Sequence, residues 1–160
     1  MPSPLDYLAA CPPCGWCCRG ERVYLSADEA RILGIGDKAT ALGQQVSGAC
    51  ELLDAATGYC RAHSLRPTEC RLFPLDIIRV NGGEPEWVLW DEPCPVGRAS
   101  LHGSATRADA IAKWELEMQR WEALLTPEWV AGYLEHHAEQ PAKYWHRGYL
   151  PLRGVARTRT

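Results

Sequence analysis

The amino-acid sequence predicts a small α+β protein, in which a cysteine-rich half with a β-hairpin packs against C-terminal helices. Three observations support this fold class. All eight cysteines lie within the first 94 residues, two β-rich runs flank a turn between residues 75 and 90, and a helical pattern begins near residue 108. We expect one domain over residues 1–160, with a cysteine-cluster core at 8–98, a helical cover at 105–138 and a tail at 139–160.

Composition excludes several functional classes. Hydrophobic residues make up 46% of the chain, charged residues 23%, and the formal net charge is −3, which is not the profile of a nucleic-acid or membrane-surface binder. No hydrophobic run approaches the roughly 20 residues that span a bilayer. The opening MPSPLDYLAA lacks the basic and hydrophobic regions of a secretory signal, so we expect a cytoplasmic protein that binds neither nucleic acid nor membrane.

The first regular elements are expected in residues 21–34, ERVYLSADEARILG, which predict a short strand followed by a helix. Ser26 is a good N-cap, and Glu29 follows it at the capping-box spacing. Gly34 is a natural stop for the helix. Residues 35–49 are small and polar, which predicts a loop or a weak turn of helix.

Residues 75–90, LDIIRVNGGEPEWVLW, predict a β-hairpin. Asn81, Gly82 and Gly83 separate two β-rich runs and tolerate the positive φ of tight turns. Pro85 has no backbone N–H to donate, so we expect the second run to lie at the edge of its sheet.

Two helices are expected in the second half of the chain. Hydrophobic residues at alternating spacings of three and four indicate one face of a helix; they are Ile111, Trp114, Met118, Trp121 and Leu125. Thr126 and Pro127 supply the N-cap and first-turn proline of a second helix. We interpret the tryptophan-rich face as packing onto the cysteine-bearing half, and the tail as a frayed, solvated terminus.

The number of cysteines is the anomaly of this sequence; they are Cys11, Cys14, Cys17, Cys18, Cys50, Cys60, Cys70 and Cys94. Three explanations compete: a disulfide framework, a metal site and a redox-active thiol pair. In a reducing compartment, spaced cysteines bind metal more often than they form stable disulfides. Two prolines before Cys14 and six further cysteines disfavour a thioredoxin-type pair.

The spacing within CPPCGWCC, residues 11–18, favours a metal. Cysteines two residues apart can direct both sulfur atoms at one ion, and thiolates suit zinc and iron–sulfur clusters. The repeated spacing of Cys11, Cys14 and Cys17, with the remote Cys94-Pro95, is typical of ferredoxins that hold a 4Fe–4S cluster. Cys18 directly follows Cys17, so we expect it to face a second site or a bridged cluster, or to remain a spare thiol.

The complete pattern resembles the CxxCxxCC family, also called YkgJ-type cysteine-cluster proteins, which are described as zinc- or iron-chelating. The resemblance covers about residues 8–98. It rests on the CxxCxxCC motif itself, Cys11, Cys14, Cys17 and Cys18, which we call the name motif. The further matches are Arg19-Gly20, Cys50, Cys60, RPTECRLFP at 66–74 and Cys94-Pro95. It implies that all eight cysteines are metal ligands. A similar cluster occurs in flagellin lysine N-methylases, which implies that the module can sit in modifying enzymes.

Basic residues near the cysteines fit an anionic centre. Four thiolates on Zn²⁺ or on an oxidised 4Fe–4S core leave a net charge of about −2. We expect Arg19, Arg66 and Arg71 to lie behind the ligands and donate hydrogen bonds to sulfur. Arg61 is as readily an ordinary surface arginine. His63 stands where the family commonly has an aromatic residue. Its place three residues after Cys60 would let it replace a sulfur ligand, although eight cysteines are already present.

We therefore expect a metal-binding protein with a 4Fe–4S cluster, slightly favoured over zinc, and a redox or modification role. The alternatives are a structural zinc protein that acts as an interaction module for a protein partner, and a protein that takes up and passes on metal. No hydrolytic triad, phosphate-binding glycine loop or paired-carboxylate motif is visible, so the sequence assigns no reaction. Because ligation by thiolates is coupled to folding, we expect the metal to stabilise the cysteine-rich half.

Overall fold

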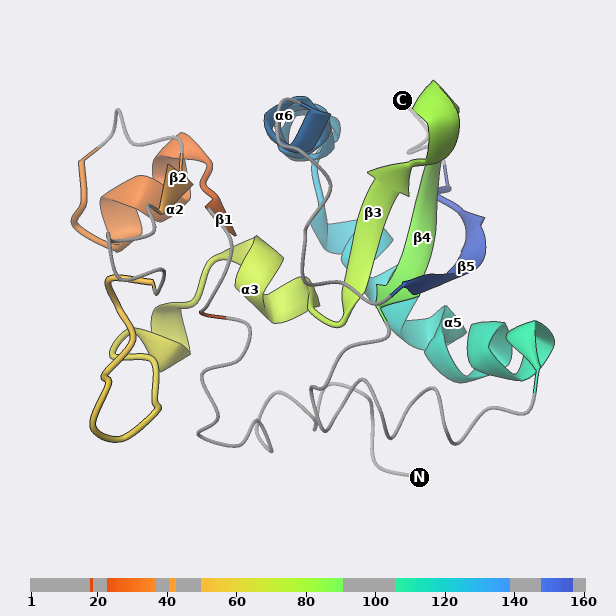
Figure 1. Ribbon diagram of the computed structural model, residues 1–160. Helices are drawn as coiled ribbons and strands as arrows, with labels where there is room; N and C mark the ends of the chain where they lie inside the picture. The colour runs from red at the N-terminus through yellow and green to blue at the C-terminus, as the bar shows by residue number, and fades with distance from the viewer. Residues whose placement is uncertain are drawn as a thin grey trace. The chain divides into compact units, whose positions relative to one another are not determined.

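The computed structural model of the protein describes residues 18, 23–36, 41–42, 50–90, 106–138 and 148–156. These residues belong to two compact units (Figure 1). The cysteine-bearing unit comprises the described residues from 18 to 73, and the sheet unit comprises those from 74 to 156. Helices and a small antiparallel sheet occur together, which confirms the α+β class. The single-domain arrangement stays a prediction.

The cysteine-bearing unit begins with β1, Val23–Tyr24, which pairs antiparallel with β2, Ala41–Leu42. Its helices are α2, Ala27–Ile32, the short 3-10 helix η1, His63–Leu65, and α3, Thr68–Leu72. The sequence predicts a loop or a weak turn of helix over residues 35–49, and β2 corrects that prediction. β2 has only two residues, and so short a strand carries too little β-propensity to be recognised in the sequence.

The predicted start of α2 is confirmed. The Ser26 hydroxyl accepts a hydrogen bond from the backbone N–H of Glu29 at 3.3 Å, and the Glu29 carboxylate accepts one from the backbone N–H of Ser26 at 2.9 Å. This reciprocal pair is the capping box. Gly34 follows the helix with φ of 69°, a conformation that glycine adopts without the strain of a side chain.

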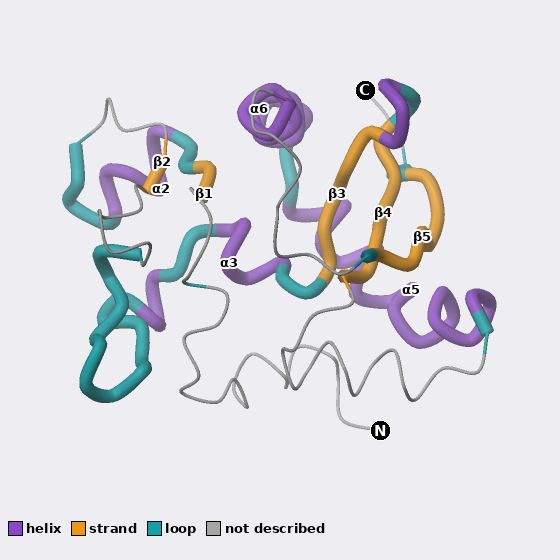
Figure 2. Tube along the Cα trace, in the orientation of Figure 1, coloured by secondary structure: helices purple, strands orange, loops and turns teal. Residues whose placement is uncertain are grey.

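The sheet unit is built on three antiparallel strands in the order β3-β4-β5, which lie side by side in Figure 2. They are β3, Leu75–Arg79, β4, Pro85–Trp90, and β5, Tyr149–Gly154. The predicted hairpin is confirmed: Leu75 pairs with Leu89 and Arg79 with Pro85. A 3-10 turn, η2, Val80–Gly82, joins the strands, and Asn81 in it has φ of 52°.

Two sequence predictions about this sheet are wrong. Pro85 does not mark an edge strand, because β4 pairs with β3 on one side and β5 on the other. Pro85 is tolerated there as the first residue of the strand, and its carbonyl accepts a hydrogen bond from Val155 N at 3.0 Å. The tail is not frayed throughout, since residues 149–154 form β5. The register of β5 against β4 shifts between the pairs Glu86–Gly154 and Val88–Pro151.

Both predicted helices are present, as α5, Arg107–Leu124, and α6, Pro127–Ala138. Thr126 accepts a hydrogen bond from Trp129 N at 3.1 Å, which confirms its capping role. Within the sheet unit, α5 contacts β5 and α6 contacts β3. The predicted packing of the tryptophan face onto the cysteine-bearing half stays a prediction. No helix among the described residues is long and apolar enough to cross a membrane.

The core of the sheet unit joins strands and helices. Trp87, Val88 and Leu89 of β4 are fully buried, as expected for a central strand. The helices add Trp114 and Met118 of α5, which are also buried. The amphipathic face predicted for α5 is therefore its core face.

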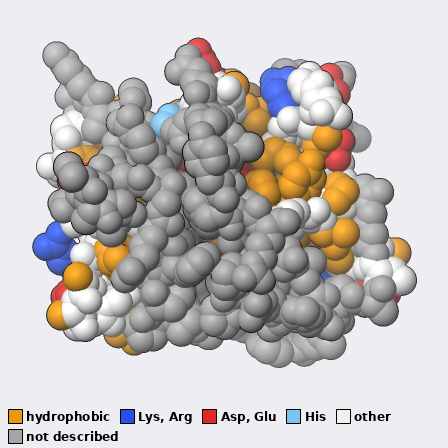
Figure 3. Space-filling model, in the orientation of Figure 1, with side chains coloured by type: hydrophobic (Ala, Val, Ile, Leu, Met, Phe, Trp, Pro, Cys, Tyr) orange, Lys and Arg blue, Asp and Glu red, His pale blue; other side chains and the backbone are white. Residues whose placement is uncertain are grey.

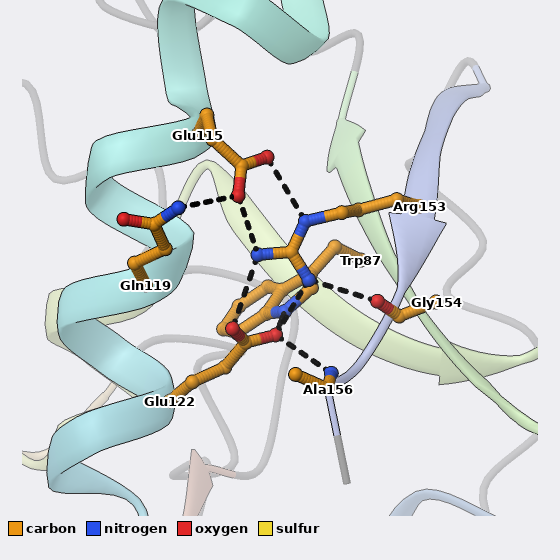
Figure 4. A network of polar contacts seen from close by, with 7 residues as sticks. All are labelled: Trp87, Glu115, Gln119, Glu122, Arg153, Gly154 and Ala156. Carbon is orange, nitrogen blue, oxygen red and sulfur yellow. Dashed lines mark hydrogen bonds and ion pairs between the residues drawn. The ribbon is translucent and has the colours of Figure 1, made fainter.

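Arg153 of β5 binds two carboxylates of α5 (Figure 4). Its guanidinium lies 3.0 and 3.1 Å from the two oxygens of Glu115, and 2.7 and 3.0 Å from those of Glu122. Glu122 also accepts hydrogen bonds from Trp87 Nε1 and Ala156 N, both at 2.8 Å. Two bidentate pairs on one arginine fix the third strand to the helix.

The charges of this network depend on one another. Hydrogen bonds from Arg153 lower the pKa of Glu115. Burial alone would raise the pKa of Glu122, but hydrogen bonds from Arg153, Ala156 and Trp87 outweigh burial and lower it. The two carboxylates in turn raise the pKa of Arg153. All three groups are therefore ionised at neutral pH.

Replacing this arginine should destabilise the sheet unit in a pH-dependent way. Arg153→Met leaves Glu122 facing Glu115 with no cation between them, and we expect a loss of about 3 kcal/mol at pH 7. Because the folded pKa values of both carboxylates lie below their ordinary value of 4.5, the contribution is present above that pH and is lost as pH falls through the folded values. Urea unfolding at several pH values, followed by tryptophan fluorescence, measures both effects.

The matched control is Arg79→Met, which removes an exposed arginine of the same sheet. It should change the free energy of unfolding by less than about 1 kcal/mol. A difference between wild type and Arg153→Met that is the same at pH 3 and pH 7 would contradict the proposed ion pairs.

Candidate metal centre

Four of the eight predicted cysteine ligands lie within the described residues: Cys18, Cys50, Cys60 and Cys70. Each is partly buried, and none of the four takes part in a disulfide. The other four, Cys11, Cys14, Cys17 and Cys94, lie outside the described residues. The described part of the cluster therefore offers thiols, the form from which metal-binding thiolates are made.

A backbone hydrogen bond brings the first two of these cysteines together. Cys50 N donates to the carbonyl of Cys18 at 2.7 Å, although 32 positions separate the two residues. The name motif of the sequence thus ends beside the start of the middle cysteine segment.

Residues 50–61 fold back on themselves, which brings Cys60 opposite the segment that begins at Cys50. Cys60 forms an antiparallel bridge with Leu53, and Arg61 N donates to Leu52 O at 2.8 Å. Asp54 nucleates the turn, because its Oδ1 accepts from Ala56 N at 2.9 Å and from Thr57 N at 3.2 Å. Sequence reasoning missed this turn, and the pair Asp54 and Gly58 was the signal that could have found it.

Cys70 reaches the same region from helix α3. Val23, Leu25 and Ala30 form a small buried cluster, and Cys50 and Cys70 both pack against it. Side chains from the middle cysteine segment and from the RPTECRLFP signature therefore share one hydrophobic support. Three stretches of chain, at 18, 50–61 and 68–72, converge in this unit.

The electrostatics of Cys50 suit a cation. Burial raises the pKa of its thiol, and the neighbouring Cys60 raises it further. Leu52 N lies 3.5 Å from Cys50 Sγ and opposes this rise as a hydrogen-bond donor. Two partly buried thiolates repel each other, and a bound cation removes that repulsion. Thiolates bind zinc and iron well, so the thiols of Cys50 and Cys60 are ligands of the type that either metal prefers.

The arginines near the cysteines have structural contacts. Arg66 Nε donates to the carbonyl of His63 at 3.0 Å, and the Arg61 guanidinium donates to the carbonyl of Glu51. Arg71 is exposed, and Arg19 lies outside the described residues. The hydrogen bonds predicted from Arg19, Arg66 and Arg71 to ligand sulfurs stay predictions. Burial and the nearby Arg66 lower the pKa of His63, which keeps its imidazole neutral at pH 7.

Among the described residues, no three His, Cys, Asp or Glu side chains are grouped so as to hold a metal ion. Half of the predicted ligands lie outside those residues. The assignment of all eight as ligands stays a prediction.

A cavity of about 260 Å³ in the sheet unit is unrelated to this centre. Its wall is mainly apolar and includes Leu125, Val130, Leu134 and Val155, with Arg79 and Glu84 also lining it. Figure 3 shows hydrophobic side chains at the surface on the side of the view where β3 and β4 lie, next to basic and acidic ones. None of the described residues that line this cavity is a cysteine or a histidine.

Residues 10–95 match the family model CxxCxxCC, described as "Putative zinc- or iron-chelating domain". The chain belongs to the CxxCxxCC family. The match confirms the resemblance found in the sequence, and it spans all eight cysteines of this CxxCxxCC protein. No curated protein and no solved structure matches the chain. Family membership therefore indicates zinc or iron chelation and does not assign a reaction.

Proposed function

We propose that this CxxCxxCC protein holds a 4Fe–4S cluster through its cysteine thiolates and uses it in a redox or modification role. The observation that supports the proposal is that Cys18, Cys50, Cys60 and Cys70 lie in one unit as thiols rather than disulfides, with Cys50 hydrogen-bonded to Cys18 and packed with Cys70 on the same hydrophobic cluster. The name motif and Cys94 would supply the remaining ligands. When bound, such a cluster supplies one-electron transfer.

The spacing of the cysteines supports iron–sulfur over zinc. Cys11, Cys14 and Cys17 repeat a two-residue gap, and Cys94 precedes a proline, as in ferredoxin-type sites. Zinc is the second candidate, because four thiolates complete its tetrahedral shell without any cofactor assembly. A zinc-bound protein would act as an interaction module or as a carrier of metal.

Metal analysis after anaerobic purification distinguishes the two. An iron–sulfur protein is brown, absorbs near 400 nm and releases acid-labile sulfide, whereas a zinc protein is colourless and contains zinc in a fixed ratio. We expect Cys50→Ser, Cys60→Ser and Cys70→Ser each to lower the bound metal per chain. His63→Ala is the control, and its metal content should equal that of the wild type. Wild-type protein that contains zinc and no labile sulfide would overturn the iron–sulfur proposal in favour of the zinc alternative, and protein that holds neither metal, even after anaerobic reconstitution, would overturn both.

A further inference from the structure

Two carboxylates connect α3 to the segment that contains β1 and α2. Glu29 of α2 accepts a hydrogen bond from Thr68 N, the first residue of α3, at 2.6 Å. Glu69 of α3 accepts one from Tyr24 N of β1 at 2.5 Å. Each segment thus donates a backbone N–H to a carboxylate of the other. We call Glu29, Glu69 and these two bonds the carboxylate clasp.

Glu29 uses its two oxygens for different partners. One oxygen completes the capping box with Ser26, and the other binds Thr68, 39 positions away. Pro67, the residue before α3, offers no side-chain cap, so Glu29 takes over the role that an N-cap side chain has in other helices. Although burial opposes ionisation, the bonds from Thr68 and Ser26 lower the pKa of Glu29, and its carboxylate is charged at neutral pH.

Glu69 is the more buried member, with 8% of its surface exposed. It directly precedes Cys70, whose side chain packs against Val23, Leu25 and Ala30. A carboxylate beside a candidate thiolate is unfavourable by charge alone, because like charges repel. Its bond to Tyr24 N joins α3 to β1 and indicates a geometric role for Glu69.

We propose that Glu29 and Glu69 are positioning residues that hold α3 so that Cys70 can act as a metal ligand. This inference rests on the proposed function. α3 has only five residues, too few to be stable alone, so contacts outside the helix must fix its direction. The clasp fixes it at two successive positions, Thr68 and Glu69, immediately before the cysteine.

Cobalt(II) is a suitable probe, because the intensity of thiolate-to-cobalt charge-transfer absorption reports how many thiolates bind the ion. We expect Glu29→Met and Glu69→Met to weaken Co²⁺ binding about 10- to 100-fold in competition with a chelator. Their absorbance per bound ion should fall to that of Cys70→Ser. Adding Cys70→Ser to either variant should cause no further loss of Co²⁺ affinity. If the Met variants acted only by destabilising the fold, the loss from Cys70→Ser would add to theirs.

Conservative replacements and a matched control complete the test. Glu69→Gln keeps an acceptor for Tyr24 N and should recover most of the affinity, and it remains informative if the Met variants do not fold. Asp28→Asn changes an exposed carboxylate of the same helix and should bind Co²⁺ like the wild type. If both Met variants bound Co²⁺ with wild-type affinity and absorbance, the proposed positioning role of Glu29 and Glu69 would be wrong. A wild type without thiolate-to-cobalt absorption would instead contradict ligation by these thiolates, on which the proposed function depends.

Discussion

Removal of the bound metal is expected to unfold the cysteine-bearing unit and leave the sheet unit folded. The described residues of the cysteine-bearing unit include four buried hydrophobic side chains, against fifteen in the sheet unit. So thin a core contributes little free energy of folding. A structural thiolate-bound metal can contribute about 10–16 kcal/mol, as zinc does in small domains, and this contribution is lost with the metal.

Hydrogen exchange measured with and without a chelator locates the effect. Amides of α2, α3 and residues 50–61 should lose protection, whereas amides of β3, β4 and β5 should keep it. The control is wild-type protein mixed with a chelator that was loaded with metal beforehand, because that chelator cannot extract the metal of the protein. Unchanged circular dichroism and melting temperature, after metal loss is verified by elemental analysis, would show that the metal does not stabilise this unit.

Asp76→Ala is expected to destabilise the sheet unit by about 4 kcal/mol. Asp76 is 4% exposed, and its carboxylate accepts hydrogen bonds from Trp90 Nε1 at 2.7 Å and from the Tyr133 hydroxyl. It therefore joins β3, β4 and α6 at one buried point. The substitution leaves the buried Trp90 Nε1 and Tyr133 hydroxyl without this acceptor, and the loss of each bond costs about 1–3 kcal/mol.

A double-mutant cycle with Tyr133→Phe tests this assignment. Tyr133→Phe removes the stranded hydroxyl, so Asp76→Ala should cost less in that background than in the wild type. The exposed Asp109→Ala is a control for the loss of an aspartate, and it should cost about 1 kcal/mol, because it removes the carboxylate that accepts a hydrogen bond from the Thr106 hydroxyl at 2.8 Å. Additive losses for Asp76 and Tyr133 in chemical unfolding would rule out the bond as the source of the effect.

Local signals predicted most elements of the fold. The turn at Asn81 and Gly82, and the caps Ser26 and Thr126, each depend on a few neighbouring residues, and all were found. β5 was missed because it contains Pro151 and owes its existence to pairing with β4, about 60 positions earlier. Because β5 also pairs with β4, β4 is the central strand, and the edge position predicted from Pro85 is wrong. Pairing between distant strands leaves no periodic trace in one sequence.

The candidate site shows the same division. The cysteines were recognisable from their spacing, and family membership supports their role. Glu29 was found as a capping residue, but nothing local indicates that its second oxygen binds Thr68. Likewise, Arg153 lies in a stretch predicted to be frayed, and its partners Glu115 and Glu122 are more than 30 positions away. Contacts of this range require the folded chain.

The strand order β3-β4-β5 has a consequence for biosynthesis. A ribosome releases the chain from its N-terminal end, so the segments of the cysteine-bearing unit become free to assemble before the sheet unit can be completed. Until residue 154 has left the exit tunnel, one side of β4 remains without its partner strand. An open strand side is the surface on which nascent chains mispair with one another. Chaperone protection during translation would therefore matter most between synthesis of Trp90 and synthesis of Gly154.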